Sequence, residues 1–531
     1  MHPGEDKMWK ISRALRKNCK YTPPLRSDGQ LVASPQRKAD LLAENFAAAH
    51  NNTADSDPDT SRVVEESIRQ IHDSPSEPDT NYLVRPKQVQ EMIKKIKNKK
   101  SPGCDKICNQ LLKHLPRKAI ILLARIFTAC LKHCYFPCGW KHAIIVPIPK
   151  PGKDITNPSN YRPISLLSSL SKLLERAILS RLEQHLETAH VIPDEQFGFK
   201  HGHSTNHQLV RLISHIKSGF HNKQSSGMIL LDVEKAYDSV WHDAILHKML
   251  SAGFPVRLIK IVESFIKNRS FQVIVNGVSS GRKNIPYGVP QGSVLSPTLY
   301  NIFTADVVMV DGAEYYIFAD DTAFIATDRD PEIVVTKLQA AQSALEEYQR
   351  KWKMKINPAK TQAIYFSNRR SPRYLPQRCV IAGGHEVEWS TEVKYLGLNL
   401  DQKLKFASHV QKSLQKCDKL VKSLYSLICR RSRLNKTSKL LLYRAIIRPT
   451  ITYGFPAWSS CARTHRKKLQ IKQNRLLKMM LNLDPYHPTN DLHQVAGINT
   501  IDEFIFKLLP KFWDSCNMSE NPLLQTIPRP L

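Results

Sequence analysis

The sequence contains no run of about 18 or more apolar residues, the least that a membrane-spanning helix requires. Its apolar stretches are short, and Ala119–Ala124, for example, is followed at once by Arg125. We therefore expect no membrane span. Residues 1–20 are basic and polar and contain no apolar segment of signal-peptide type, so secretion is not expected either.

Acidic residues are scarce relative to basic ones: 47 Asp and Glu face 78 Lys and Arg, a formal net charge of +31. A surplus of this size indicates a polyanionic partner, of which nucleic acid is the commonest, whereas a merely solubilising surface needs far less charge. From Lys403 to Lys478 there are twenty Lys or Arg and one acid, Asp418. Apolar residues recur there at helical spacing, which predicts folded helices with basic faces.

Eleven cysteines suit a reduced intracellular compartment. Cys130, Cys134 and Cys138 recur every four residues, with His133 and His142 nearby, so zinc is one interpretation. A structural zinc site, however, usually combines a ligand pair on a turn with a second pair at a distance. The apolar neighbours of these cysteines are typical of an amphipathic helix, and we expect the three thiols on one buried helical face.

A chain of 531 residues is expected to form two to four packed units, and its mixture of strand and helix patterns predicts an α+β fold. Near the N-terminus a short helix is predicted at Lys38–Ala49, and loops or linkers at Asn51–Pro58 and Asp73–Asp79. After Pro163, leucine and isoleucine at steps of three and four from Leu167 to Leu186 predict a helix. Its charged residues fall on the other faces. They are Lys172, Glu175, Arg176 and Arg181.

Three acids are predicted to lie at strand ends. Gly227–Leu231 is an apolar run that ends in Asp232, and two aromatic-rich apolar runs flank Asp320 and Asp321, as in a hairpin. Between these segments, Ser296 resembles an N-cap with Pro297 at the first helical position, opening a helix through Phe303.

Adjacent carboxylates beside apolar strands repel each other and lose hydration, and a divalent cation relieves both costs. Magnesium prefers carboxylate oxygens, and two such ions about 4 Å apart can activate a 3′-hydroxyl and stabilise a leaving pyrophosphate. An isolated Asp-Asp pair is more often a solvated turn. The assignment therefore depends on further motifs.

Nine motifs occur in a fixed order between about residue 80 and residue 400. They are Ser101–Asp105, Ile148–Lys150, Asn160–Ser165, Gln196–Lys200, Leu231–Asp238, Gly288–Pro297, Phe318–Asp321, Ile356–Thr361 and Lys394–Gly397. Together they resemble the reverse transcriptases of non-LTR (LINE-type) retrotransposons, especially the Jockey-like group. The resemblance implies an RNA-directed DNA polymerase, a nucleotidyltransferase that adds deoxynucleotides to a DNA primer on an RNA template.

The resemblance also implies roles for single residues. Asp232, Asp320, Asp321 and the carbonyl of Val233 would bind two Mg²⁺ ions, for which Mn²⁺ can substitute. Lys360 would protonate the departing pyrophosphate.

The deoxynucleoside triphosphate would meet a second group of residues. Tyr237 would exclude a 2′-hydroxyl by its bulk, and Gln291 would hydrogen-bond the sugar or backbone. Lys150 and Arg162 would hold the triphosphate. Phe197–Lys200 would line the template path, with an aromatic face for stacking, and Tyr395–Gly397 would position the primer end.

The family's right-hand architecture predicts a domain order with a basic helical thumb that grips the template–primer duplex through its backbone. The expected parts are a connector (1–80), fingers with an N-terminal extension (81–225), an antiparallel palm (226–400, with a fingers insertion near 250–285) and the thumb with the C-terminal region (401–531).

Complete Jockey-like proteins usually carry an endonuclease upstream of the polymerase. No nuclease motifs precede residue 80 and no ribonuclease H pattern follows residue 400, so we expect endonuclease activity to come from a missing upstream domain or from elsewhere. Two other hypotheses stay open: a catalytically silent, domesticated RNA-binding protein, and a group II intron maturase. The expected location is an intracellular ribonucleoprotein, nuclear and cytoplasmic.

Overall fold

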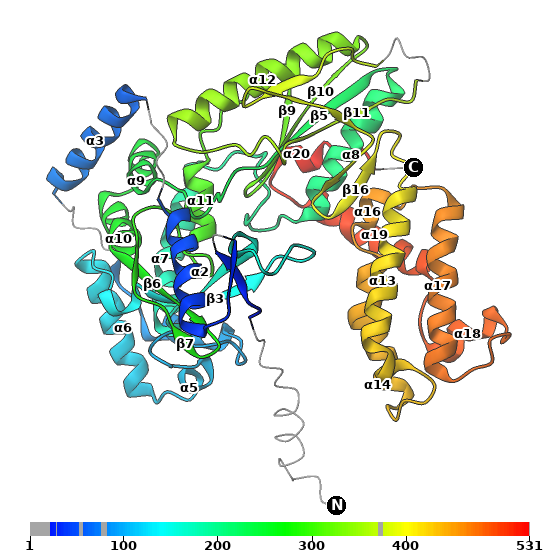
Figure 1. Ribbon diagram of the computed structural model, residues 1–531, viewed down its shortest axis with the longest axis horizontal. Coiled ribbons are helices and arrows are strands. Elements are labelled where there is room, and N and C mark those ends of the chain that lie inside the picture. The colour runs from blue at the N-terminus through cyan, green and yellow to red at the C-terminus, as the bar shows by residue number, and fades with distance from the viewer. Residues whose placement is uncertain (1–21, 28, 52–56, 76–81, 370–374, 530–531) are drawn as a thin grey trace, which may run out of the picture. The chain divides into compact units, whose positions relative to one another are not determined.

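The computed structural model describes residues 22–27, 29–51, 57–75, 82–369 and 375–529 (Figure 1). The chain divides into two compact units. Unit 1 takes in the described residues up to Ile192 together with Glu234–Asp306 and Gln349–Lys355, and unit 2 takes in Pro193–Val233, Val307–Tyr348 and the described residues from Ile356 onward. This division differs from the predicted connector, fingers, palm and thumb, whose boundaries stay predictions.

Unit 1 contains a mixed sheet of five strands: β3 (His142–Pro149), β4 (Tyr161–Leu166), β6 (Arg269–Val275), β7 (Val278–Ser279) and β8 (Lys283–Ile285). The strand order is β4-β3-β6-β7, with β8 also paired to β6, and β3 runs parallel to β6. Helix α2 (Pro35–Ala49) packs its buried side chains Leu42 and Phe46 into the same core as Phe271. The predicted helix at Lys38–Ala49 is confirmed, and it begins earlier because Pro35 suits a first helical turn.

The remaining regular elements of unit 1 are mainly helices. They are β1 (Leu25–Ser27), β2 (Gln30–Val32), α3 (Pro58–Asp73), α4 (Pro86–Lys95), α5 (Asn109–Lys113), α6 (Arg117–Lys132), η2 (Cys138–Trp140), η3 (Pro158–Asn160), α7 (Ser169–Thr188), α9 (His242–Ser251), α10 (Val256–Ile266) and α11 (Ser296–Phe303). Helix α3 was not predicted. The predicted loops beside it fall largely on residues 52–56 and 76–79, which lie outside the described residues.

Two predicted helix starts need correction. The helix after Pro163 begins only at Ser169, because residues 161–166 form β4 and Ser168 caps the helix by accepting from the N–H groups of Leu170 and Ser171. The predicted helix at 296–303 is confirmed as α11, but Ser296 is its first residue and not its N-cap. The Ser296 hydroxyl donates instead to the carbonyl of Pro290, 2.9 Å away.

The prediction for the cysteine series is wrong in part. Helix α6 ends at Lys132, and Cys134 follows in a left-handed conformation (φ 51°) that a continuing helix cannot contain. Cys130 is buried, Cys134 is partly buried and Cys138 is exposed, so the three thiols do not share one buried helical face.

Unit 2 is built around a second sheet of five strands, in the order β14-β11-β5-β10-β9. The strands are β5 (Ser225–Leu231), β9 (Glu314–Phe318), β10 (Asp321–Asp328), β11 (Gln362–Phe366) and β14 (Trp389–Ser390). All pairs are antiparallel except β11 with β14. The predicted strand before Asp232 and the predicted hairpin around Asp320 are therefore confirmed.

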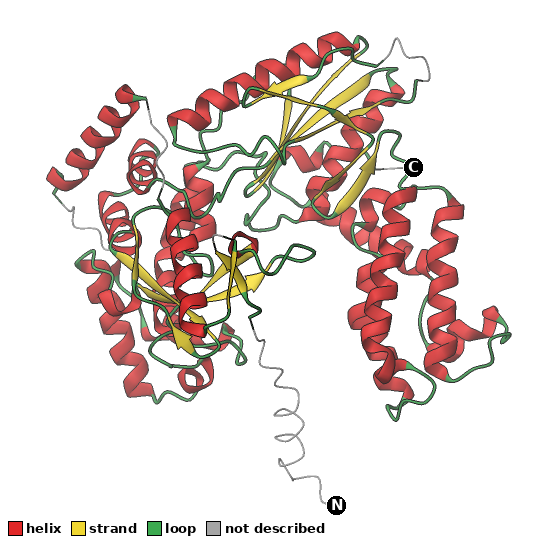
Figure 2. Cartoon of the chain, viewed as in Figure 1, coloured by secondary structure: helices red, strands yellow, loops and turns green. Residues whose placement is uncertain are grey.

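Helices cover both faces of this sheet, as Figure 2 shows. Helix α12 (Pro331–Lys351) packs Val334 and Leu338 with Ile229 of β5 on one face. Helix α8 (Thr205–His221) packs with the alternate residue, Met228, on the other. Because successive strand residues point to opposite faces, a nearly continuous apolar strand suits a sheet buried on both sides.

The C-terminal part of unit 2 is helical, and the predicted helices after Asp401 are confirmed. Two hairpins precede them: β12 (Val380–Ala382) with β13 (His385–Val387), and β15 (Glu392–Tyr395) with β16 (Leu398–Asp401). The helices are α13 (Ala407–Ile428), α14 (Lys436–Leu442), η5 (Tyr443–Ile447, a π-helix), α15 (Arg448–Ile451), α16 (Phe455–Trp458), α17 (Arg463–Leu481), α18 (Thr489–Ala496), α19 (Ile501–Asn517) and α20 (Pro522–Gln525).

The long helices of this region are amphipathic. Helix α13 buries Val410 and Cys417, while its lysines at 412, 416, 419 and 422 are exposed. The predicted basic faces are thus present. No helix in the described part of the chain is both long and apolar enough to cross a membrane.

Gly227 allows α12 to pack closely on β5. A Cβ at this position would lie 2.7 Å from Leu338 Cδ1 and 2.8 Å from Val334 Cγ1, and both side chains are fully buried. We expect Gly227→Ala to lower the free energy of unfolding by about 1–3 kcal/mol through overpacking, as measured by denaturant titration. Gly139→Ala is the control, because no atom lies within 4 Å of the added Cβ. Equal stability of the two variants would contradict this account.

Candidate active site

The register of unit 2's sheet brings the predicted acids together. In the antiparallel pair of β5 and β10, Leu231 faces Thr322, so the next residues, Asp232 and Asp321, face each other at the strand ends. Asp320 lies one residue earlier, in the two-residue turn between β9 and β10. Three acids separated by almost ninety positions in sequence therefore meet at one end of the sheet.

The electrostatics of this strand end show an excess of negative charge. Asp321 reaches solvent, but protein atoms surround much of its carboxylate. This partial burial, followed by the charges of Asp320 and Asp232, raises its pKa from 3.8 to about 6. Lys394 opposes the shift. A carboxylate whose pKa is raised by burial and by neighbouring acids is a group whose ionised form a cation would stabilise.

Lys360 supplies part of the missing positive charge. Its Nζ donates to Asp232 Oδ2 at 2.8 Å, and both side chains remain substantially exposed. Lys360 and Lys394 line one cavity with Asp232, Asp321 and the turn Leu396–Gly397. Lys394 stands in the motif Lys394–Gly397 but has no predicted role, and only the fold shows that it lies beside the acids.

The backbone around Val233 is compatible with a further oxygen ligand. Residues 233 and 356 form an isolated antiparallel bridge, in which the Asp232 carbonyl accepts from Asn357 N at 2.8 Å. The bridge does not use the Val233 carbonyl, because directly opposed residues in an antiparallel ladder alternate between bonded and non-bonded pairs.

The donor set fits a hard divalent cation, although the described residues contain no group of three or more His, Cys, Asp or Glu side chains already placed to hold a metal. One physical reason why the acids are not already placed around a metal is the ion pair of Asp232 with Lys360, which turns one carboxylate toward an ammonium group. The raised pKa of Asp321 shows that the acids lack full compensation. Binding of a metal at Asp232 Oδ2 would require Lys360 to release this oxygen.

In unit 1, the structure brings Tyr237 and Gln291 onto adjoining segments. The Tyr237 ring stacks on Tyr300 with centroids 4.8 Å apart, and the Tyr237 carbonyl accepts from Val289 N at 2.8 Å. Gln291 Nε2 donates to Asp238 Oδ1 at 2.9 Å.

The two predicted phosphate-binding cations differ in their surroundings. Both lie on the β3–β4 hairpin, where Ile148 pairs with Arg162. Arg162 is exposed. Lys150 is partly buried, and its Nζ donates to the carbonyl of Ser159 at 2.9 Å. Arg162 is therefore the more accessible of the two.

Two buried acids that sequence reasoning missed hold the loop of Gln291. Asp238 accepts from Gln291, and burial raises the pKa of its carboxyl group. Glu175, predicted on a face of its helix other than the apolar one, is fully buried and accepts from Ser293 Oγ at 2.7 Å and Val294 N at 2.6 Å. Asp238 is the last residue of the motif Leu231–Asp238, and its place in that motif is a sequence signal that could have identified it as a site residue. Nothing local marks Glu175 as buried.

The predicted template segment needs a correction. Phe197 is 1% exposed, with its ring edge-on to His203, so it cannot offer a face to a base. Phe199 is 63% exposed in a left-handed conformation (φ 56°), and Lys200 pairs with Asp194 at 3.3 Å. Phe199 is therefore the phenylalanine of this segment whose ring is exposed.

The predicted primer-positioning turn is held by two tyrosine hydroxyl groups. Tyr395, which is buried, donates to the carbonyl of Tyr316 at 3.0 Å. The hydroxyl of Tyr453, from the helical region, donates to the carbonyl of Leu396 at 2.7 Å. Tyr453 carries no sequence signal of its own.

Comparison with known proteins agrees with this site. Residues 148–400 match the family described as reverse transcriptase (RNA-dependent DNA polymerase). This stretch of the chain, with the strand-end acids at its centre, belongs to the reverse transcriptase family.

Several relatives that match most of the chain come from transposons of Drosophila melanogaster. The probable RNA-directed DNA polymerase from transposon BS is 32% identical over 96% of this chain and 56% of its own length. The probable RNA-directed DNA polymerase from transposon X-element is 31% identical over 98% of this chain and 57% of its own length. The RNA-directed DNA polymerase from mobile element jockey is 34% identical over 83% of this chain and 48% of its own length. The chain thus spans about half the length of these relatives.

The raised pKa of Asp321 makes a prediction for the metal-free protein. Between pH 3.8 and about 6 the folded protein holds a proton at Asp321 that the unfolded chain has released, so stability falls as the pH rises through this window. We expect Asp321→Asn, which cannot ionise, to raise the melting temperature in EDTA more at pH 8 than at pH 4. Asp311→Asn, an exposed acid of the same unit, is the control. An equal gain at both pH values would contradict the charge origin.

Proposed function

We propose that this chain acts as an RNA-directed DNA polymerase of a non-LTR retrotransposon, transferring deoxynucleotides to a primer 3′-hydroxyl on an RNA template. One observation carries the proposal: the β5–β10 register sets Asp232 opposite Asp321, beside Asp320 at the hairpin turn. The family match over residues 148–400 supports it. We also propose an intracellular ribonucleoprotein, nuclear and cytoplasmic, as the location of this activity.

The proposed metal ligands are Asp232, Asp320, Asp321 and the carbonyl of Val233. Two Mg²⁺ ions held there, or Mn²⁺ in their place, would supply activation of the 3′-hydroxyl and charge stabilisation of the leaving pyrophosphate. The acids themselves need to be ionised to bind, and the raised pKa of Asp321 indicates that metal binding and deprotonation are linked.

Lys360 has two proposed tasks. Without metal its ammonium group compensates the charge of Asp232, with which it pairs at 2.8 Å. When Asp232 serves as a metal ligand, the same ammonium group would be free to protonate the departing pyrophosphate. Lys394, on the same cavity, supplies a second positive charge.

The deoxynucleotide is proposed to be selected by shape in unit 1. The Tyr237 ring, fixed by its stack on Tyr300, would occupy the volume that a 2′-hydroxyl needs. Gln291, oriented by Asp238, would contact the sugar or backbone of the nucleotide. Arg162, with its planar fork, would hold the triphosphate, and Lys150 would assist.

The template and primer are proposed to contact unit 2. Phe199 offers an exposed ring to a template base, and the turn Tyr395–Gly397 positions the primer end. The exposed lysines of α13 and the basic face of α17 would form the thumb, which grips the duplex through its phosphates. Such contacts weaken steeply as salt rises and are insensitive to sequence.

Asp320→Asn tests the metal role. We expect this variant to lose primer extension on a primed RNA template with Mg²⁺ or Mn²⁺, while its affinity for the same template stays within about threefold of wild type, since most affinity comes from phosphate contacts. Asp311→Asn should retain extension. An equal loss of binding by Asp320→Asn would indicate a folding defect in place of a metal role. Absence of extension by the wild-type protein would refute the proposed function.

Tyr237→Ala tests the steric gate. Removal of the ring opens the space for a 2′-hydroxyl, so we expect ribonucleotide incorporation relative to deoxynucleotide to rise by about 10-fold or more, measured as a ratio of kcat/KM values. Tyr237→Phe keeps the ring and should discriminate as wild type does. Unchanged discrimination in Tyr237→Ala would remove this residue from the gate.

A further inference from the structure

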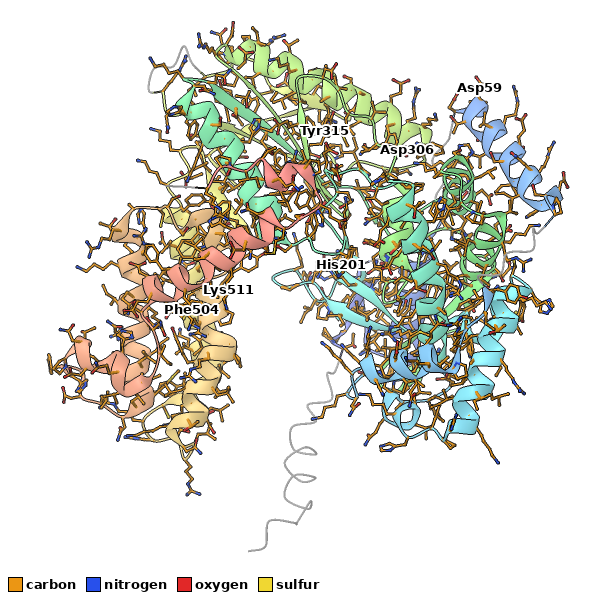
Figure 3. The ribbon with its side chains drawn as sticks, turned by 180° about the vertical axis from the view of Figure 1, so that it is seen from behind. Asp59, His201, Asp306, Tyr315, Phe504 and Lys511 are labelled. Atoms are coloured by element: carbon orange, nitrogen blue, oxygen red, sulfur yellow. The ribbon has the colours of Figure 1, made fainter. Side chains whose placement is uncertain are left out.

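The loop before α8 lies on the edge of the hairpin that carries Asp320. The backbone at Gln196 bridges in parallel with Ile317 of β9. Phe197 N donates to the Ile317 carbonyl at 2.9 Å, and Ile317 N donates to the Glu195 carbonyl at 3.2 Å. Figure 3 labels Tyr315 on β9 and His201 in the loop. The loop thus extends the sheet beside its edge strand.

The side chain of Gln196 reaches the turn itself. It is 2% exposed, and its Oε1 accepts from Gly198 N and from Ala319 N, both at 2.8 Å. Because both partners are N–H donors, the oxygen and not the amide nitrogen must face them. One buried acceptor therefore satisfies two backbone donors, one from the loop and one from the catalytic turn.

The turn at Ala319 requires such support. Ala319 has φ 57°, a left-handed conformation that costs free energy for a residue with a Cβ. Gly198 lies against it so closely that a Cβ on the glycine would be 2.2 Å from Ala319 N. The contact with Gly198 and the hydrogen bond from Ala319 N to Gln196 restrict the conformation of the turn. The next residue in the chain is Asp320.

A second glutamine secures the loop without touching the turn. Gln208 of α8, which is fully buried, donates from Nε2 to the carbonyls of Ile317 and Glu195, at 3.2 and 3.3 Å. Gln208 therefore holds the loop against β9, and the amide oxygen of Gln196 is what reaches Ala319.

We infer that Gln196 is a positioning residue for the catalytic turn: its amide oxygen fixes the left-handed Ala319, and thereby sets the place of the Asp320 carboxylate for metal binding. The inference rests on the proposed function for the identity of the metal ligands. Gln196 does not touch metal or substrate and acts only through the turn.

Two substitutions at Gln196 separate the hydrogen bond from packing. Gln196→Met keeps the length of the side chain and removes the acceptor, whereas Gln196→Glu keeps an acceptor oxygen. We expect Gln196→Met to weaken Mn²⁺ affinity about 10-fold, measured by electron paramagnetic resonance titration without nucleic acid, since a buried N–H loses its partner. Hydrogen exchange at the Ala319 amide should accelerate at the same time. Gln196→Glu should stay within about threefold of wild type.

Gln342→Met is the matched control, because Gln342 is a fully buried glutamine of unit 2 whose Nε2 donates to Glu346 on its own helix. Unchanged Mn²⁺ affinity in folded Gln196→Met, or an equal loss in Gln342→Met, would overturn the inference. If Gln196→Met does not fold, Gly198→Ala tests the turn from the other side. Its Cβ should displace Ala319 and weaken Mn²⁺ binding, and unchanged affinity would overturn the inference.

Primer extension by the wild-type protein distinguishes the two claims. If the wild type extends a primer and Gln196→Met binds Mn²⁺ as the wild type does, the positioning role fails while the proposed function stands. If the wild type binds Mn²⁺ and Gln196→Met does not, but neither extends a primer, the proposed function fails while the positioning role stands.

Discussion

The antiparallel register of β5 and β10 is the constraint on which the rest of the site depends. A shift by one residue would turn Asp232 away from Asp321 and would also move Met228 and Ile229 to the wrong faces of the sheet. The cores under α8 and α12 therefore fix the register, and the register fixes the acids. Packing free energy far from the strand ends in this way holds like charges near each other.

Local sequence patterns predicted much of this arrangement. Apolar runs ending in acids located β5 and the β9–β10 hairpin, and basic amphipathic periodicity located the helices after Asp401. The order of the motifs identified the remaining candidate site residues. A resemblance to a family indicates which residues lie close together in the fold, and spacing in the sequence alone does not. The register that sets Asp232 opposite Asp321 joins segments almost ninety residues apart and became visible only in the fold.

The failures have different causes, and one of them depends on partners distant in sequence. Glu175 resembles a solvent-facing helical acid until Ser293 and Val294, more than a hundred positions later, supply its hydrogen bonds. Phe197 resembles a stacking aromatic, but its ring is buried beside His203. The helical prediction for Cys134 failed for a local reason. A left-handed residue follows the end of the helix, and no glycine in the sequence marks this position.

The ion pair of Lys360 with Asp232 affects the electrostatic interaction of the cavity with a polyanion. Two carboxylates alone would repel nucleic acid, whereas Asp232 and Asp321 together with Lys360 and Lys394 give the cavity a formal charge of zero. A nearly neutral cavity in a chain of net charge +31 leaves the field of the basic surface unopposed. The resting protein can thus attract phosphates from a distance before any divalent ion has arrived.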